Sequence, residues 1–169
     1  AEVRFQLGYI YLLNNDFENA EKELNRALDF GYPANQIIPL LARAYQRTEA
    51  NTALIELKHD DPRLTVGEQV QVGFYKLQAL LNLAKMDEAE ALINSLLILN
   101  TGSIYKELIQ IVSLMIENDM STALDRAVTL QKQAPSNKDV LNVTGQLYLR
   151  NQQPDKAADV YSEYIKKAP

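Results

Sequence analysis

The chain has no cysteine, no tryptophan and a single histidine among its 169 residues. Without cysteine it has no disulfide, no thiol nucleophile and no cysteine-based metal site, although this alone does not identify its compartment. No run reaches the length of about 18 apolar residues that a membrane-spanning helix needs. A glycine-rich phosphate loop and a pair of histidines at helical spacing are also missing. We therefore expect no cofactor, no metal ion and no transmembrane segment in this chain.

The charge of the chain is acidic and evenly spread. It carries 17 Lys and Arg against 22 Asp and Glu, a net charge of −5. The charges do not gather into a run, which is typical of solvated helix faces. Because the sequence shows no basic stripe, we do not expect nucleic acid as a partner.

Large side chains recur along the chain at a nearly constant interval. The first series is Tyr11, Tyr45, Leu80, Leu114 and Tyr148, at steps of 34, 35, 34 and 34 residues. A second series with the same steps is Ala20, Leu54, Ala89, Ala123 and Ala157. A period of this length predicts helical hairpins, which cannot bury their apolar faces alone and must stack on one another.

The first and last units carry a specific motif at this period. The first reads Arg4-x-x-Leu7-Gly8-x-x-Tyr11, then Ala20, Leu24, Ala27 and Pro33, and the last reads Leu141-x-x-Thr144-Gly145-x-x-Tyr148, then Ala157, Tyr161 and Pro169. Both resemble the tetratricopeptide (TPR) repeat, except that Arg4 and Leu141 stand where the motif begins with Trp. The resemblance implies an all-α, right-handed superhelix of about five hairpins and ten helices, with binding as its function.

The period divides the chain into one array without remainder. The expected hairpins cover about 1–33, 34–66, 67–101, 102–135 and 136–169, and we interpret the chain as a fragment of a longer repeat protein. Hairpin two is the least regular, with a short second helix at about 51–57 and a polar loop after it. In hairpins three and four Leu77 and Ile111 replace the small residue at Gly8, which indicates a looser or shifted helix contact. The outer side chains of the last helix, Val160 and Tyr164, are expected to be partly uncovered.

One cluster resembles a reactive site. His59, Asp60 and Asp61 are adjacent and could be a metal site or an acid and base pair. Three consecutive residues rarely converge on one ion, so we interpret the segment as a solvated loop before Pro62.

The inner stripe of each first helix is the expected binding surface, because those side chains would line the concave groove of the array. The candidate partner-binding residues are Phe5, Tyr9, Pro39, Arg43, Gln46, Arg47, Phe74, Gln78, Asn82, Asn142, Gln146 and Arg150. Leu12, Leu81, Leu108, Val112, Met115 and Leu149 share the stripe, and for Leu108 and Val112 packing against a neighbouring helix is at least as good an interpretation. Rings, amides and arginines together suit an extended peptide. The Lys and Asn pattern of the chaperone-binding carboxylate clamp is missing, since Phe5 and Tyr9 occupy its first places.

A narrower resemblance covers residues 7–57 and 74–169. The runs Leu7-Gly8-Tyr9-Ile10-Tyr11-Leu12, Phe17-Glu18-Asn19-Ala20-Glu21-Lys22-Glu23-Leu24, Gly31-Tyr32-Pro33 and Pro39-Leu40-Leu41-Ala42-Arg43-Ala44 resemble the PEP-CTERM system TPR-repeat lipoproteins. This implies an exported protein of the periplasm, associated with exopolysaccharide production and PEP-CTERM protein export, and anchored in the outer membrane through a lipidated Cys outside this chain. A cytoplasmic location stays open.

The sequence therefore favours a non-enzymatic scaffold that binds a protein or peptide partner in its groove. One alternative is a carbohydrate-handling module that guides an exopolysaccharide, with the rings of Phe5, Tyr9 and Phe74 stacked on sugars. Another is a structural middle segment without a ligand of its own. An enzyme is disfavoured, because no nucleophile can be paired with a base.

Overall fold

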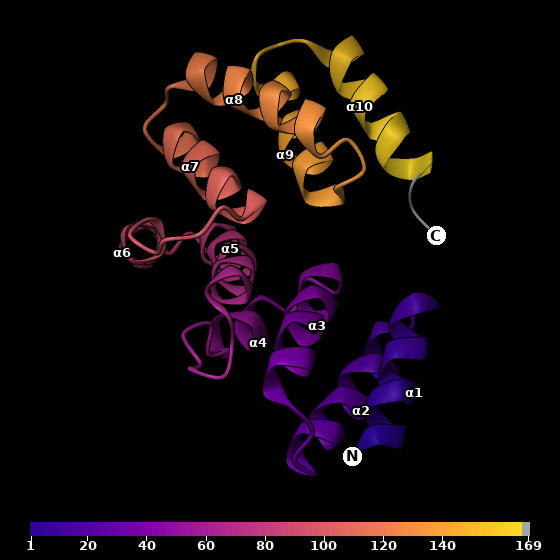
Figure 1. The fold of residues 1–169 in the computed structure, drawn as a ribbon. Coiled ribbons are helices and arrows are strands. Elements are labelled where there is room, and N and C mark those ends of the chain that lie inside the picture. The colour runs from indigo at the N-terminus through magenta and orange to yellow at the C-terminus, as the bar shows by residue number, and fades with distance from the viewer. Residues whose placement is uncertain (167–169) are drawn as a thin grey trace. The chain divides into compact units, whose positions relative to one another are not determined.

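The computed structural model describes residues 1–166, which form ten α-helices and no strand. The helices are α1 Glu2–Leu13, α2 Phe17–Asp29, α3 Ala34–Arg47, α4 Asn51–Glu56, α5 Val66–Asn82, α6 Met86–Leu97, α7 Ile104–Ile116, α8 Met120–Gln133, α9 Lys138–Arg150 and α10 Pro154–Lys166 (Figure 1). The predicted number of helices is confirmed. Pro169, expected to end the last repeat, lies outside the described residues.

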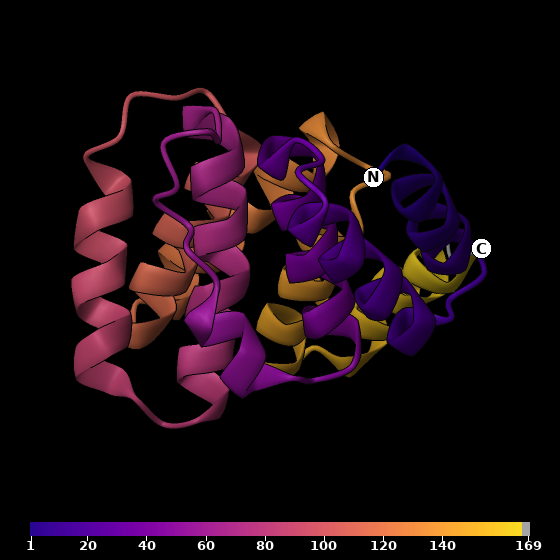
Figure 2. The same ribbon diagram turned by 90° about the horizontal axis from the view of Figure 1, so that it is seen from below.

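The chain divides into two compact units, Ala1–Tyr105 and Lys106–Pro169. In the first unit α2 packs against both α1 and α3, α3 packs against α5, and α5 packs against α4 and α6. Figure 2 shows α5 and α6 running side by side in opposite directions. In the second unit α9 packs against α8 and α10. A second helix such as α2 therefore serves two hairpins, its own and the next.

Each pair of helices is joined by the same backbone turn. One residue with a positive φ ends the first helix of every hairpin, and these residues are Asn15, Glu49, Ala84, Asn118 and Gln152. Their spacing repeats the steps of 34, 35, 34 and 34 seen in the sequence. The next residue donates its backbone N–H to the carbonyl five positions earlier, as Asp16 does to Tyr11 at 2.9 Å and Lys85 to Leu80 at 2.9 Å. This 6→1 bond is that of the Schellman motif, which glycine usually completes.

The left-handed residues of these turns carry side chains, which is unfavourable by about 1 kcal/mol or more for an ordinary residue. We therefore expect Ala84→Gly, at φ 55°, to raise the free energy of unfolding by about 1 kcal/mol. Urea denaturation followed by circular dichroism measures the change. Ala91→Gly at an exposed position inside α6 is the control, because glycine there should lower stability by about 1 kcal/mol. Destabilisation by both substitutions would contradict the role given to the turn.

Glycines set the closest approach between the two helices of a hairpin. A Cβ atom on Gly8 would lie 2.8 Å from Leu24 Cγ, and one on Gly145 would lie 2.6 Å from Tyr161 Cζ. In hairpin three the equivalent place belongs to Leu77, which is fully buried, and the close approach has moved one helical turn to Gly73 and Leu96. Of the two outcomes expected for this hairpin, the contact is shifted. In hairpin four Ile111 is likewise fully buried.

Filling the tightest crossing should destabilise the first hairpin. Gly8→Ala places a methyl group against Leu24 Cγ and 3.2 Å from the Leu24 backbone nitrogen, so helices α1 and α2 must separate. We expect a loss of about 1 to 3 kcal/mol in a thermal or urea melt. Gly102→Ala is the matched control, because no atom lies within 4 Å of its new Cβ. Equal effects of the two changes would show that crowding at Gly8 is not the cause.

An ion-paired cluster occupies the place where the repeat motif begins with an aromatic residue. Arg4 donates to Glu23 Oε2 at 2.7 Å, and Arg26 donates to Glu23 Oε1 at 2.9 Å. Glu23 is only 6% exposed. The hydrogen bond from Arg4 is the main reason that the pKa of this carboxyl lies below its usual 4.5, and Arg26 adds to it. A polar pair thus joins α1 to α2 where an aromatic ring would otherwise pack.

Hairpin two has the shortest second helix and the longest connection between described helices, as predicted. Helix α4 ends at Glu56, and residues 57–65 lead to α5, which begins with a capping box between Thr65 and Glu68. The connection is not simply solvated. Asp61 is buried, and its carboxylate accepts two hydrogen bonds from the Arg63 side chain, at 2.9 and 2.7 Å, which help to lower its pKa from 3.8 to about 2. The expectation of a plain surface loop is therefore wrong for this residue.

The outer side chains of the first and last helices, α1 and α10, differ in how far they are exposed. Val160 is 6% exposed, so the prediction that it would be partly uncovered is wrong, whereas Tyr164 is half-buried as expected. At the other end α1 exposes Val3 and Ile10. The residues 34 positions later, Ile37 and Ala44, are buried in α3, which packs against the preceding α2.

Candidate partner-binding surface

The first helices of the first unit place the predicted residues on neighbouring elements. Helix α3 contacts both α1 and α5, so the predicted residues lie on contacting helices. The accessible members of this set are Phe5, Tyr9, Pro39, Arg43, Gln46, Arg47, Gln78 and Asn82, which are all exposed or half-buried. We call these eight residues the first-helix stripe.

Aromatic rings form one end of the first-helix stripe. The ring of Phe5 stacks on Tyr32, with centroids 4.3 Å apart, and lies 6.3 Å from the ring of Tyr9. Tyr9 is 42% exposed, whereas Phe5 is half-buried. The Tyr32 hydroxyl donates to Gln36 Oε1 at 3.2 Å. The pKa of Tyr32 is raised, chiefly by burial and to a smaller extent by the nearby Glu2. The result is a fixed stack of rings with one open ring at its edge.

Helix α3 supplies the charged part of the stripe. Pro39 lies inside this helix and is half-buried, and one turn later Arg43 is exposed. Gln46 and Arg47 follow on the last turn and are half-buried. Within residues 1–166 Arg43 takes part in no ion pair. Its guanidinium is therefore available to an external carboxylate.

Helix α5 contributes amide groups. Gln78 is half-buried, and its Oε1 atom is shielded from solvent without a hydrogen-bond donor. Asn82 is exposed and its Nδ2 donates to Asn51 Oδ1 at 3.4 Å. An unsatisfied buried oxygen is costly, so a donor that reached Gln78 would be bound favourably.

Phe74 is not part of the accessible surface, which corrects its assignment to the binding residues. It is fully buried, with ring centroids 5.7 Å from Tyr75 and 5.6 Å from Tyr105. Tyr105 is fixed over it by a hydrogen bond from Gln71 Nε2 at 3.1 Å and by a 3.3 Å contact with the Tyr75 hydroxyl. Tyr105, the last residue of the first unit, thus covers this point, which the helical phase of α5 alone could not indicate.

The predicted residues of the second unit lie on α9. Gln146 and Arg150 are exposed and Asn142 is half-buried, and Gln146 Nε2 lies 3.5 Å from Asn142 Oδ1. On α7 both Leu108 and Val112 are buried, so the packing interpretation holds for these two. Arg150, like Arg43, makes no ion pair within the described residues.

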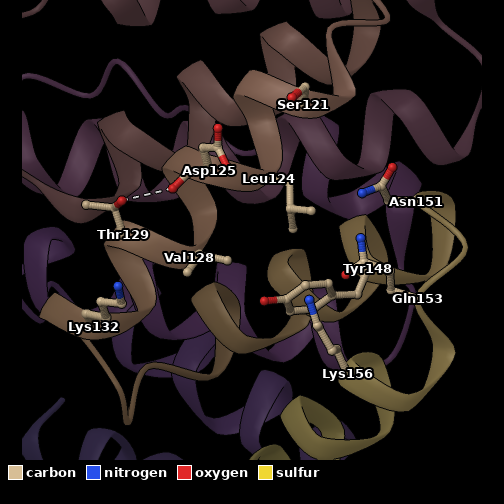
Figure 3. Close-up of a pocket in the computed structure, with 10 residues that line it drawn as sticks. All are labelled: Ser121, Leu124, Asp125, Val128, Thr129, Lys132, Tyr148, Asn151, Gln153 and Lys156. Atoms are coloured by element: carbon tan, nitrogen blue, oxygen red, sulfur yellow. Dashed lines mark hydrogen bonds between the residues drawn. The ribbon is translucent and has the colours of Figure 1, made fainter.

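A cavity of about 590 Å³ lies elsewhere in the second unit, between α8 and the start of α10 (Figure 3). It is lined by Ser121, Leu124, Asp125, Val128, Thr129, Lys132, Tyr148, Asn151, Gln153 and Lys156. No pattern in the sequence indicates it, because the periodic stripe of candidate binding residues lies on the first helices, and most of this lining belongs to second helices. We call it the α8–α10 pocket.

The α8–α10 pocket is polar and carries two cations. The ammonium of Lys156, on α10, lies 5.7 Å from the centroid of the Tyr148 ring. Lys132 lies on α8, away from Lys156 (Figure 3). Asp125 is the acidic member of the lining. Gln153 presents a buried Oε1 atom that has no donor. These groups could hold a small polar molecule, but they lie apart from the stripe.

The reactive cluster expected as a loop does not assemble a site. No group of three or more metal-ligating side chains is present among residues 1–166. Burial, with a smaller effect of Lys76, lowers the pKa of His59, and its Nδ1 atom is buried without a partner. Asp61 is already occupied by Arg63. None of the described helices has the length and apolar character of a bilayer-spanning helix.

Comparison with protein families identifies both ends of the chain. Residues 1–30 and residues 117–169 each match a model described as tetratricopeptide repeat. These segments are tetratricopeptide repeats. No curated protein sequence matches the chain at a significant level.

Solved structures extend the TPR fold over nearly the whole chain. The crystal structure of MamA protein matches with a TM-score of 0.54 and 12% identity, covering 98% of this chain and 90% of that one. YrrB, described as a TPR protein with an unusual peptide-binding site, matches with a TM-score of 0.50 and 15% identity, covering 98% of this chain and 85% of that one. At these identities the likeness establishes the TPR fold alone, and the predicted fold class is confirmed.

Proposed function

We propose that the chain is a non-catalytic scaffold that binds a protein or peptide partner through the first-helix stripe. The observation that carries the proposal is the exposed Tyr9 ring, supported by the Phe5 and Tyr32 stack, on a helix that contacts the one bearing the unpaired Arg43. The TPR fold supports the same function, and YrrB, a protein of this fold, is described as having a peptide-binding site.

The chemistry of the stripe matches an extended peptide. A ring that is held by its neighbours loses little conformational entropy on binding, so Tyr9 can anchor an apolar side chain. The amide groups of Gln46, Gln78 and Asn82 can pair with the backbone N–H and C=O groups that an extended peptide presents. The carbohydrate alternative is weaker, since one of its three rings, Phe74, is buried and the Phe5 ring is stacked on Tyr32.

Binding through the stripe is tested with peptides selected from a randomised display library on the parent protein. The double variant Tyr9→Ala and Gln46→Ala should raise Kd by about tenfold, because it removes the anchor and a backbone partner. Fluorescence anisotropy measures Kd, and circular dichroism confirms unchanged helix content.

The control for this experiment changes the α8–α10 pocket. Thr129→Ala and Lys132→Ala alter the lining of the α8–α10 pocket and should leave Kd within about twofold. If the pocket variant lost binding while the stripe variant kept it, the function would belong to the pocket.

We further propose the cellular setting that the narrower sequence resemblance implies: an exported scaffold of the periplasm, lipid-anchored through a Cys outside this chain, that takes part in exopolysaccharide and PEP-CTERM protein export. The support is the run of residues through Gly31-Tyr32-Pro33 and Pro39-Leu40-Leu41. Osmotic-shock fractionation and protease accessibility of the full-length protein test this setting. Recovery with cytoplasmic markers would contradict it.

A further inference from the structure

Acidic side chains are missing from the inner stripes of the first helices. The sequence contains 22 Asp and Glu residues, yet none of the predicted stripe positions on the five first helices is acidic. The charged residues at these positions are arginines, namely Arg43, Arg47 and Arg150. Positions that carry arginines and no acids, in a chain of net charge −5, favour a negatively charged group over a positive one at those positions.

The arginines that are not among the predicted binding residues, Arg4, Arg26, Arg63 and Arg126, are all paired within the protein. Arg4 and Arg26 bind Glu23, Arg63 binds Asp61 at 2.7 Å, and Arg126 binds Glu107 at 3.0 Å. Arg43 and Arg150, by contrast, have no acidic partner within residues 1–166 and are exposed. Guanidinium groups prefer planar, bidentate acceptors such as carboxylates. The two that remain unpaired lie on the stripes of α3 and α9.

The acids that the first helices do carry lie near their N-terminal ends. Glu2 and Asp139 lie in the first turns of α1 and α9, where a negative charge is favourable. Glu68 caps α5 by accepting from Thr65, and Glu107 is paired with Arg126. The later turns of α3 and α9, which bear Arg43 and Arg150, therefore carry no acidic side chain of their own helix.

We infer that the first-helix stripe selects an acidic peptide segment, with a carboxylate held by Arg43 and an apolar side chain of the segment against Tyr9. Arg150 holds a carboxylate on α9 in the same way. This inference rests on the proposed function and adds the chemical class of the partner. The amide side chains at the predicted positions are uncharged, so the arginines determine the charge preference for a partner. These amides are Gln46, Gln78, Asn82, Asn142 and Gln146.

The competing location for an acidic segment is the α8–α10 pocket, because Lys132 and Lys156 also make no ion pair in the described chain. There, however, Asp125 shares the lining. Any test must therefore remove equal charge from the two places.

The experiment compares the parent with two variants of equal charge. In this experiment the stripe variant carries Arg43→Gln, on the first-helix stripe, and Arg150→Gln, on α9 of the second unit. The matched variant carries Lys22→Gln, exposed on α2, and Lys156→Gln, in the pocket. Each is panned against a random twelve-residue peptide display library, and the frequency of Asp and Glu in the selected peptides is compared with the input library.

We expect Asp and Glu to be enriched about twofold or more on the parent and on the matched variant, and not on the stripe variant. A selected peptide should bind the stripe variant about threefold to fivefold more weakly at low salt, as suits exposed ion pairs, and the difference should disappear at 0.5 M NaCl. Replacing its acids by Gln should have the same effect on binding to the parent. A polygalacturonate oligomer that displaced the peptide at equal carboxylate concentration would overturn the peptide assignment.

The outcomes separate this inference from the function on which it rests. If selected peptides lack acid enrichment but lose binding with Tyr9→Ala, the scaffold function holds and the acidic preference is wrong. If the matched variant rather than the stripe variant loses enrichment, the pocket is the acidic site and the inference is overturned. If no selected peptide depends on any stripe residue, both proposals fail.

Discussion

The turn between the two helices of a hairpin sets the register of every repeat in this molecule. A left-handed residue and a 6→1 backbone bond occur in all five hairpins, at Asn15, Glu49, Ala84, Asn118 and Gln152. Because the bond involves only backbone atoms, the side chain at that position is free to vary. The turn fixes where each first helix ends and where the second begins, and it therefore fixes which side chains face inward. The position of Arg43 on a helix that contacts the one bearing Tyr9 depends on this repeated geometry.

Periodicity predicts the helices well, because a hairpin that cannot bury its own face must repeat. The short α4, the irregular connection after it and the close crossing at Gly8 could all be inferred from the motif and from departures from it. The phase of a helix, however, tells only which side a residue faces. It does not tell what lies over that side, and for this reason the phase of α5 places Phe74 on the surface although Tyr105 covers it.

The remaining differences have the same origin in tertiary contacts. In hairpin three the closest approach of the two helices lies at Gly73 instead of Leu77, one helical turn away. There the Leu96 side chain fills the space that a side chain at position 73 would occupy. Asp61 is buried and accepts hydrogen bonds from Arg63, two positions away, in a connection that has no place in the repeat. The α8–α10 pocket depends on the space between second helices, whose outer side chains follow no motif.

The exposed outer face of α1 has a consequence for how such a protein changes over time. Val3 and Ile10 present to solvent the same positions that Ile37 and Ala44 bury in α3. When a whole hairpin is inserted or deleted, the hairpins on either side still present equivalent positions to each other. They can therefore pack together in the same way as before. Gene duplication within the array can lengthen or shorten it one repeat at a time, and each step alters the number of stripes offered to a partner while the packing between neighbours is retained.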